Sequence, residues 1–229
     1  MSIEPSIAVV VPLLNERTVL PALLEHLSTL GADELIIVDG GSTDGSCDFL
    51  AASGVCWITS AAGRSTQMNA GSALCTSDIL LFIHADTVID SGHIMAVRKA
   101  IAAPDIVGGR FDLHLSGSHP FFRIIERMIN LRSRLSGIST GDQCMFVRRA
   151  VFEQLGGFAA IPLMEDIDLS RRLKRTGRIA CLRTQVITSS RRWEQHGIFT
   201  TMVRMWWLRL LFWSGVPADR LAQMYRQAR

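Results

Sequence analysis

The first half of the chain alternates between short apolar runs and segments in which apolar residues have helical spacing. Four apolar runs predict strands buried on both faces, at residues 7–11, 35–38, 55–59 and 79–83. The segments 19–30 and 64–75 have the spacing of helices, and Gly31 is a natural end for the first of them. Strands and helices that alternate in this way predict a parallel, doubly wound sheet with helices on both faces.

The second half of the chain has a less regular pattern. We expect strands at 107–115, 143–147 and 186–190, and helices at 120–135, 165–176, 198–213 and 217–228. No linker rich in Gly, Ser or Pro interrupts the chain. We therefore expect one α/β domain over residues 1–195, Rossmann-like and mostly parallel, with a helical extension of the same domain over 196–229.

Length and composition agree with a large α/β domain, because the chain has 229 residues of which 48% are hydrophobic. No stretch of about 20 apolar residues lacks charge, so we predict no transmembrane helix. The first residues lack the basic region of a signal peptide. Five cysteines without C-x-x-C spacing are typical of reduced thiols. These features predict a cytoplasmic protein.

The formal net charge of +3 is unevenly distributed along the chain. Residues 1–109 carry 4 basic and 12 acidic side chains, whereas residues 110–229 carry 20 basic and 9 acidic ones. All but two of the basic residues are arginines, which suit bidentate contacts to phosphate. Phosphate groups and an anionic membrane surface are both compatible partners. We expect no nucleic acid, since stacking aromatics are not interleaved with the basic residues.

Polar and acidic residues follow three of the predicted strands. Parallel sheets bind ligands at the carboxyl ends of their strands. The residues at these ends are Pro12, Asn15 and Glu16 after the first strand, Asp39 after the second, and His84 and Asp86 after the fourth. Asp39 either binds a nucleotide base or ribose, or caps a turn. Asp86 either binds Mg²⁺ or Mn²⁺, which prefer carboxylate oxygens, or caps a helix near Ser91.

His84 has three open interpretations: a metal ligand, a group that orients Asp86, or a histidine satisfied at a strand end. Arg64 follows Gly63 at the start of a predicted helix, where a helix N-terminus and a guanidinium together attract anions. These residues add an anion-binding group beside the candidate metal site.

A second acidic site lies about eighty residues further along, at Glu165 and Asp166. Adjacent helical side chains point in different directions, so one of the two can act as a general base while the other holds a neighbour. Stabilisation of a helix start by acidic residues is the alternative. Further candidates for acceptor or diphosphate contacts are Gly141, Asp142, Gln143, Arg192, Trp193 and His196.

The combination of these motifs resembles family 2 glycosyltransferases with the GT-A fold. The resemblance rests on residues 10–16 (VVPLLNE), 37–44 (IVDGGSTD), His84-Ala85-Asp86, Glu165-Asp166 and Arg192-Trp193, which occur in the order found in that family. It covers residues 7 to about 193. Within the family, the chain resembles most a bacterial subgroup of arsenosugar-biosynthesis-type glycosyltransferases.

This resemblance implies an inverting hexosyltransferase-type enzyme that uses a nucleotide-diphosphate sugar and a hydroxyl acceptor. It implies a nucleotide site at Pro12, Asn15, Glu16 and Asp39 and a divalent metal at Asp86, with His84 or His196 as further candidate ligands. His84 stands where the family's Asp-x-Asp motif has its first Asp, so a weaker metal site or a metal-free one stays open. Asp166 is then the base that deprotonates the acceptor.

Two other classes of protein remain as alternatives. A sugar nucleotidyltransferase needs a Gly-rich basic loop after its first strand, and residues 12–16 contain no glycine. A non-catalytic module that binds nucleotide sugars would not require both Asp86 and Asp166.

The segment 198–213 contains three of the five tryptophans, and Arg204 and Arg209 interrupt its apolar residues. An interfacial helix that makes peripheral contact with the inner face of the cell membrane is one interpretation. A helix that packs on the domain or across a homodimer is the other.

Overall fold

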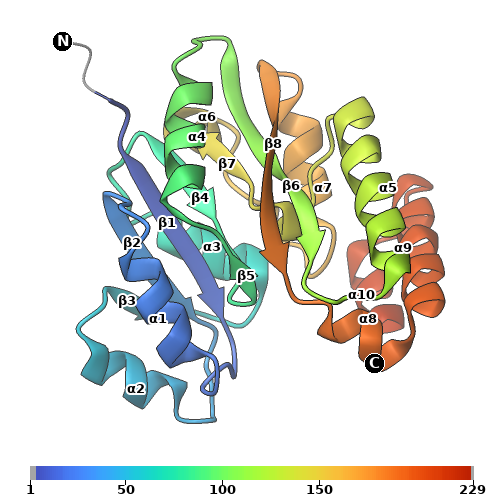
Figure 1. The fold of residues 1–229 in the computed structure, drawn as a ribbon, viewed down its shortest axis with the longest axis horizontal. Helices are drawn as coiled ribbons and strands as arrows, with labels where there is room; N and C mark the ends of the chain where they lie inside the picture. Colours follow the sequence, from blue (N-terminus) through green and yellow to red (C-terminus); the bar gives the residue numbers. More distant parts are fainter. Residues whose placement is uncertain (1–3, 228–229) are drawn as a thin grey trace.

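A computed structural model describes residues 4–227 of the chain, which contain an eight-stranded sheet between layers of helices (Figure 1). Its strands lie in the order β3-β2-β1-β4-β7-β6-β8-β5. The strands are β1 (Ile7–Leu13), β2 (Glu34–Asp39), β3 (Trp57–Thr59), β4 (Ile79–Phe82), β5 (Thr87–Val88), β6 (Ile106–Leu115), β7 (Phe146–Arg148) and β8 (Arg178–Thr188). The helices are α1 (Leu20–Ser28), α2 (Ser46–Ser53), α3 (Arg64–Ser72), α4 (Ser91–Ile101), α5 (Pro120–Ser136), η1 (Gly141–Gln143), α6 (Arg149–Gln154), α7 (Glu165–Leu173), α8 (Arg191–His196), α9 (Ile198–Trp213) and α10 (Ala218–Gln227).

The sheet is mostly parallel, as the sequence predicts, but it is not parallel throughout. β3, β2, β1 and β4 pair in parallel, and so do β6 and β8. β7 runs antiparallel between β4 and β6, and β5 runs antiparallel to β8. The predicted α/β class is therefore confirmed, with a mixed second half.

Several predicted boundaries in the second half are wrong. The strand predicted at 186–190 begins already at Arg178, because the first part of β8 is only partly buried and lacks a continuous apolar run. Gln143 lies in the 3₁₀ turn η1 and not in the following strand. The short helix α8 was not expected from the pattern. Residue 228, the predicted end of the last helix, lies outside the described residues.

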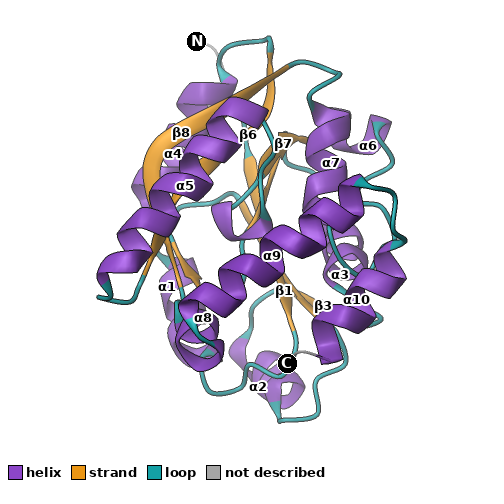
Figure 2. Cartoon of the chain, turned by 90° about the vertical axis from the view of Figure 1, so that its right-hand side faces the viewer, coloured by secondary structure: helices purple, strands orange, loops and turns teal. Residues whose placement is uncertain are grey.

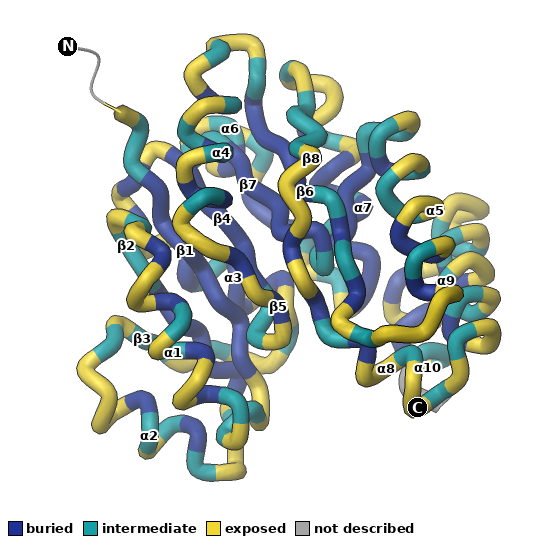
Figure 3. The backbone as a smooth tube through the Cα atoms, in the orientation of Figure 1, coloured by how far each residue is buried: buried dark blue, intermediate teal, exposed yellow. Residues whose placement is uncertain are grey.

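Alternating residues of β1 supply two separate cores. Val9 and Val11 belong to the core that α1, α2 and α4 cover, whereas Val10 belongs to the core beneath α3, α6 and α7. At Gly71, a Cβ atom would lie 2.6 Å from the Val10 side chain, so a glycine at this position lets α3 lie close to the sheet. Successive residues of the central strands are consequently buried, and these strands are dark blue in Figure 3.

The C-terminal helices pack beside α5 and the start of α7. Leu208 of α9 and Leu221 of α10 are buried with Ile138, Met164 and Ile167. Figure 2 shows α9 crossing the molecule close to α5 and α8. Within residues 4–227, no helix combines the length and the apolar character that crossing a membrane requires.

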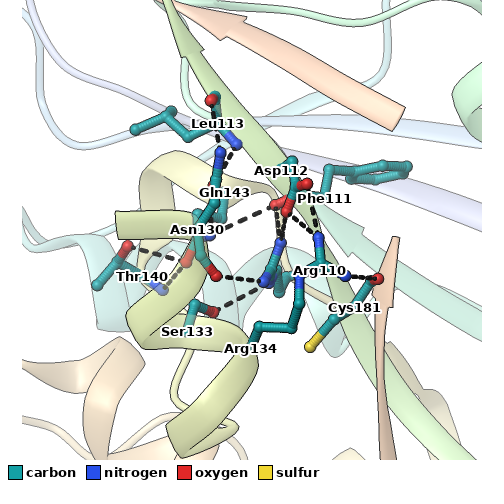
Figure 4. Close-up of polar contacts among 10 residues, drawn as sticks. All are labelled: Arg110, Phe111, Asp112, Leu113, Asn130, Ser133, Arg134, Thr140, Gln143 and Cys181. Atoms are coloured by element: carbon teal, nitrogen blue, oxygen red, sulfur yellow. Dashed lines mark hydrogen bonds and ion pairs between the residues drawn. The ribbon is translucent and has the colours of Figure 1, made fainter. Parts of the chain in front are cut away.

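A buried polar network joins α5 to β6 (Figure 4). The Arg110 side chain is fully buried, and it donates to Asp112, to the Ser133 hydroxyl at 2.9 Å and to the Asn130 carbonyl at 3.1 Å. Arg134 binds both oxygens of the same Asp112. Because buried charges are tolerated only when paired and hydrogen-bonded, this network fixes the position of α5 against the sheet.

Gly109 tests how closely the strands around β6 must pack. A Cβ atom there would lie 2.4 Å from the Ala180 carbonyl oxygen and 2.4 Å from the Phe146 ring, so backbone must move. We expect Gly109→Ala to lower the free energy of unfolding by about 1–3 kcal/mol in urea denaturation. Ala62→Ser, which adds one heavy atom at an exposed loop position, is the control and should keep wild-type stability. Equal stability of both variants would contradict the close packing around β6.

Candidate functional site

The pairing of β5 with β8 brings the two halves of the sequence together at one end of the sheet. Thr87 pairs with Thr188, and the Ser189 backbone N–H donates to the Asp86 carbonyl at 3.2 Å. The chain then enters α8, so Arg191 and Arg192 lie beside the segment that carries Asp86. Arg191 reaches within 3.9 Å of Glu16, which follows β1.

A pocket of about 210 Å³ lies at this place, and it contains most of the predicted functional residues. Those lining it are Arg64, His84, Asp86, Gly141, Asp142, Asp166, Arg192, Trp193 and His196. Thr140, Arg191, Gln195, Arg209 and Tyr225 also line it. The two acidic motifs, about eighty residues apart in sequence, therefore share one pocket.

A short chain of contacts links His84 to Asp166 through Gly141. A Cβ atom on Gly141 would lie 2.6 Å from His84 Cε1, so the His84 ring packs directly on the glycine backbone. The Gly141 N–H donates to Asp166 Oδ2 at 2.8 Å. Gly141 thus lies between the candidate base Asp166 and the segment between β4 and β5 that carries His84 and Asp86.

Glu165 points away from the solvent and holds Arg64. Its side chain is 3% exposed, and its Oε1 lies 3.0 Å from Arg64 Nε. Burial raises the pKa of Glu165 above its ordinary value, although the charge of Arg64 opposes this rise. Glu165 and Asp166 therefore have different tasks: the first positions a guanidinium, and the second faces the pocket.

The loop after β2 is built around Asp39. This carboxylate is fully buried and accepts hydrogen bonds from the Gly41 and Ser42 backbone N–H groups and from the Ser42 hydroxyl, at 2.6–2.8 Å. Burial opposes ionisation of Asp39, but the bonds from Ser42 and Gly41 bring its pKa below the ordinary value. In this structure Asp39 fixes the shape of the loop; its contact with a nucleotide stays a prediction.

Asn15 connects the ends of β1 and β2. It adopts a positive φ of 54°, its N–H donates to Ser42 Oγ at 2.7 Å, and its side chain accepts from the Thr43 N–H at 2.8 Å. Pro12 is buried within β1, and Glu16 is partly buried. Burial raises the pKa of Glu16, and the carboxylate of Asp86 contributes to the same shift. None of these four strand-end residues (Pro12, Asn15, Glu16 and Asp39) is among the described residues lining the 210 Å³ pocket.

Gln143 lies behind the pocket. It is fully buried, its Oε1 accepts from the Thr140 N–H at 3.2 Å, and its Nε2 is 3.4 Å from the Phe111 carbonyl. It therefore anchors the turn that presents Gly141 and Asp142.

Asp86 does not cap α4; Asp90 caps this helix by accepting from the His93 N–H.

The residues present fit a divalent cation in part. Asp86 is exposed in the pocket, and His84 and His196 also line it. Burial and the nearby charge of Arg64 lower the pKa of His84, which favours the neutral imidazole that metals bind. Within residues 4–227, no three His, Cys, Asp or Glu side chains form a ready-made metal cluster. A bound diphosphate would have to supply the remaining oxygens.

Sequence reasoning missed two arginines beside the site. Arg209 of α9 lines the pocket, and Arg132 of α5 lies near Asp142 and Asp166. The interruption of the apolar 198–213 segment by Arg209 was the available signal. The pattern could not show that α9 lies against α5.

Comparison with known proteins identifies the class of this fold. A mannosyltransferase of Pyrobaculum calidifontis, solved with GDP-Man and Mn²⁺, superposes with a TM-score of 0.63 at 18% identity over 81% of this chain and 57% of that chain. The structural neighbours are glycosyltransferases with the GT-A fold, so the predicted fold class is confirmed.

Sequence comparison identifies the family. Residues 8–156 match the model of glycosyl transferase family 2, and the chain belongs to this family. It is 36% identical over 170 residues to a PGL/p-HBAD biosynthesis glycosyltransferase of Mycobacterium bovis, covering 69% of this chain and 62% of the relative. It is 31% identical over 174 residues to an undecaprenyl-phosphate 4-deoxy-4-formamido-L-arabinose transferase of Serratia proteamaculans, covering 67% and 52%. The chain thus spans only about half to three fifths of these relatives.

The ionisation of His84 provides a test of the site geometry. We expect its pKa to lie below the ordinary 6.5 in the wild type and to rise in Arg64→Gln, because the substitution removes a positive charge that disfavours imidazolium. Titration of the histidine ring signals by NMR measures both values. Arg17→Gln is the matched control, since Arg17 lies over Phe49. An unchanged His84 pKa in Arg64→Gln would show that the two groups do not interact.

Proposed function

We propose that the protein is an inverting glycosyltransferase that moves a sugar from a nucleotide-diphosphate sugar to an acceptor hydroxyl. The observation that carries this proposal is the convergence of Asp86, Asp166 and Arg64 on one pocket. One carboxylate serves the leaving diphosphate, and the other serves the acceptor. Membership of family 2 supports the same reaction.

The donor site lies along the carboxyl ends of β1, β2 and β4. We assign the nucleotide to the loops of Asn15, Glu16 and Asp39, with Pro12 shaping the strand end. Asp86 would hold Mg²⁺ or Mn²⁺, with His84 or His196 as an additional ligand. Such a metal supplies neutralising charge to the diphosphate as it leaves. Arg64 and Arg192 also line this pocket and add positive charge to it.

Asp166 is the proposed base. Its Oδ2 is held by the Gly141 N–H and its Oδ1 by the Ile167 N–H at 2.7 Å, so the carboxylate has a fixed orientation. It takes the proton of the acceptor hydroxyl while the acceptor oxygen forms a bond to the anomeric carbon. The bond from that carbon to the diphosphate oxygen breaks, and the nucleoside diphosphate leaves with the electron pair. Attack opposite the leaving group inverts the configuration. The side of the pocket that carries Asp166 is positioned by Glu165, Asp142, Gly141 and Gln143. Trp193 provides the surface on which the acceptor lies.

The finer assignments are also proposals. We propose that the chain belongs with the arsenosugar-biosynthesis-type enzymes, on the motifs quoted from its sequence. We propose that residues 196–229 extend the 1–195 catalytic domain, which the burial of Leu208 and Leu221 beside Ile167 supports. A cytoplasmic enzyme with peripheral contact to the inner membrane face fits the exposed tryptophans of α9, and pairing of two copies through α9 is the competing arrangement.

Nucleotide binding tests the donor site. We expect calorimetric titration to show binding of UDP or GDP that Mn²⁺ strengthens, because a cation held by Asp86 would neutralise charge on the diphosphate. In Asp86→Ala the effect of Mn²⁺ should disappear. Asp48→Ala on the exposed side of α2 is the control, and it should bind as the wild type does. If neither nucleotide binds to the wild type, the proposed function is wrong; if Mn²⁺ has no effect, only the metal assignment is wrong.

Asp166→Asn tests the base. A loss of about 10²–10⁴-fold in kcat for sugar transfer is expected, with nucleotide affinity unchanged, because the amide cannot take a proton. Asp168→Asn provides a comparison on the same helix, since Asp168 pairs with Arg172 outside the pocket. Retention of kcat in Asp166→Asn would exclude this residue as the base.

A further inference from the structure

A second, larger hollow lies between α5 and α9. Its volume is about 910 Å³, which is in the range of sites that enclose organic ligands. Most of its lining is apolar and comes from both helices, including Ile129, Leu131, Leu135, Trp206, Leu210 and Trp213. Several of these side chains are unusually exposed for their type, with Leu135 80% and Leu210 60% accessible. We call this hollow the α5/α9 groove. Figure 2 shows the two helices that flank it.

The α5/α9 groove carries positive charge. Its charged lining residues in the described part of the chain are Arg132, Arg192 and Arg209 against the single Asp142. Arg132 Nε and Nη2 and Arg209 Nε are buried and have no hydrogen-bond partner among the described residues. Burial and repulsion by Arg209 lower the pKa of Arg132 to about 10. Buried donors of this kind are costly unless something accepts from them, and an anion is the matching acceptor.

The α5/α9 groove is continuous with the pocket of the transfer reaction. Asp142, Arg192, Trp193 and Arg209 line both. Asp142 follows Gly141, whose N–H holds Asp166. A molecule that lies in the groove with its polar end on the arginines therefore brings that end to the proposed base.

We propose that the acceptor is a lipid phosphate with a hydroxyl-bearing head group: its apolar chain lies in the α5/α9 groove and its phosphate on Arg132 and Arg209. The assignment rests on the proposed function, which it deepens by naming the acceptor class. The apolar walls match the chain, and the excess of arginine matches the phosphate. The shared end of the two hollows places the head-group hydroxyl beside Asp166.

The test compares three small probes that separate chain from charge. They are 1-lauroylglycerol 3-phosphate below its critical micelle concentration, 1-lauroylglycerol, which lacks the phosphate, and glycerol 3-phosphate, which lacks the chain. Trp206 and Trp213 line the groove, so tryptophan fluorescence reports occupancy directly. We expect the complete lipid phosphate to bind at least about tenfold more tightly than either fragment.

Variants assign the phosphate to the arginines. Arg132→Gln and Arg209→Gln should each remove the preference for 1-lauroylglycerol 3-phosphate over 1-lauroylglycerol. Because Arg132 and Arg209 repel each other, Arg132→Gln should melt at the wild-type temperature or above it. Arg127→Gln, exposed on α5 and outside the groove lining, is the matched control and should keep the preference.

Other outcomes would overturn the proposal. Equal binding of both lauroyl probes would remove the phosphate site. Binding to anionic vesicles that persists in both arginine variants, with no affinity for the monomeric lipid phosphate, would make the groove a membrane surface. A stable dimer in light scattering that blocks the fluorescence response would assign it to a second copy of the chain. UDP and GDP titrations of the same proteins distinguish failure of this inference from failure of the proposed function. Nucleotide binding without a preference for the lipid phosphate overturns this inference alone. Failure of both nucleotides to bind overturns the proposed function.

Discussion

The buried Arg110–Asp112 pair is the constraint on which the second half of the molecule depends. A fully buried guanidinium is stable only with its donors occupied, and here the carboxylate of Asp112, the Ser133 hydroxyl and two backbone carbonyls occupy them. The Asn130 side chain, which lies on α5 like Ser133, accepts from the Leu113 N–H at 2.8 Å and donates to the Leu113 carbonyl at 3.0 Å. α5 is thereby attached to β6 by polar contacts whose geometry allows little sliding. Gln143 extends the network to the turn that holds Gly141, so the position of the proposed base depends on it.

The same arrangement explains why the site has two unlike sides. The proposed donor side consists of loops after β1, β2 and β4, which parallel pairing aligns at one edge. Its polar side chains mostly bind the loops themselves, as Asp39 and Asn15 do. The other side consists of η1, α7, α8 and α9, which no regular strand order aligns. It instead depends on individual contacts such as Gly141 with His84 and Glu165 with Arg64.

Much of the side formed by the loops after β1, β2 and β4 could be predicted from the sequence. Less could be predicted of the side formed by η1, α7, α8 and α9. The apolar runs of β1, β2 and β4 are continuous because these strands are buried on both faces, so their carboxyl ends and the residues after them are readable. The first eight residues of β8 are all exposed or partly buried, so the start of this strand was predicted eight residues too late. Gln143 has a polar side chain of the kind that binds ligands. It is instead buried in the hydrogen-bond network of α5 and β6, which the spacing of residues in the sequence does not reveal. The roles of Arg132 and Arg209 depend on the packing of α5 beside α9, a tertiary fact without a local pattern.

The pocket is lined by residues from Arg64 to Tyr225, and this span has a consequence for folding. Local contacts form quickly, whereas contacts between distant segments form only after the entropy of closing long loops has been overcome. The sheet core of β1, β2 and β4 uses only residues 7–82, so we expect it to collapse early. The pocket is complete only when β8 has paired and the two last helices have docked beside α7. We therefore expect the site to form late in folding, so that a partly folded chain with an intact parallel core would still lack it.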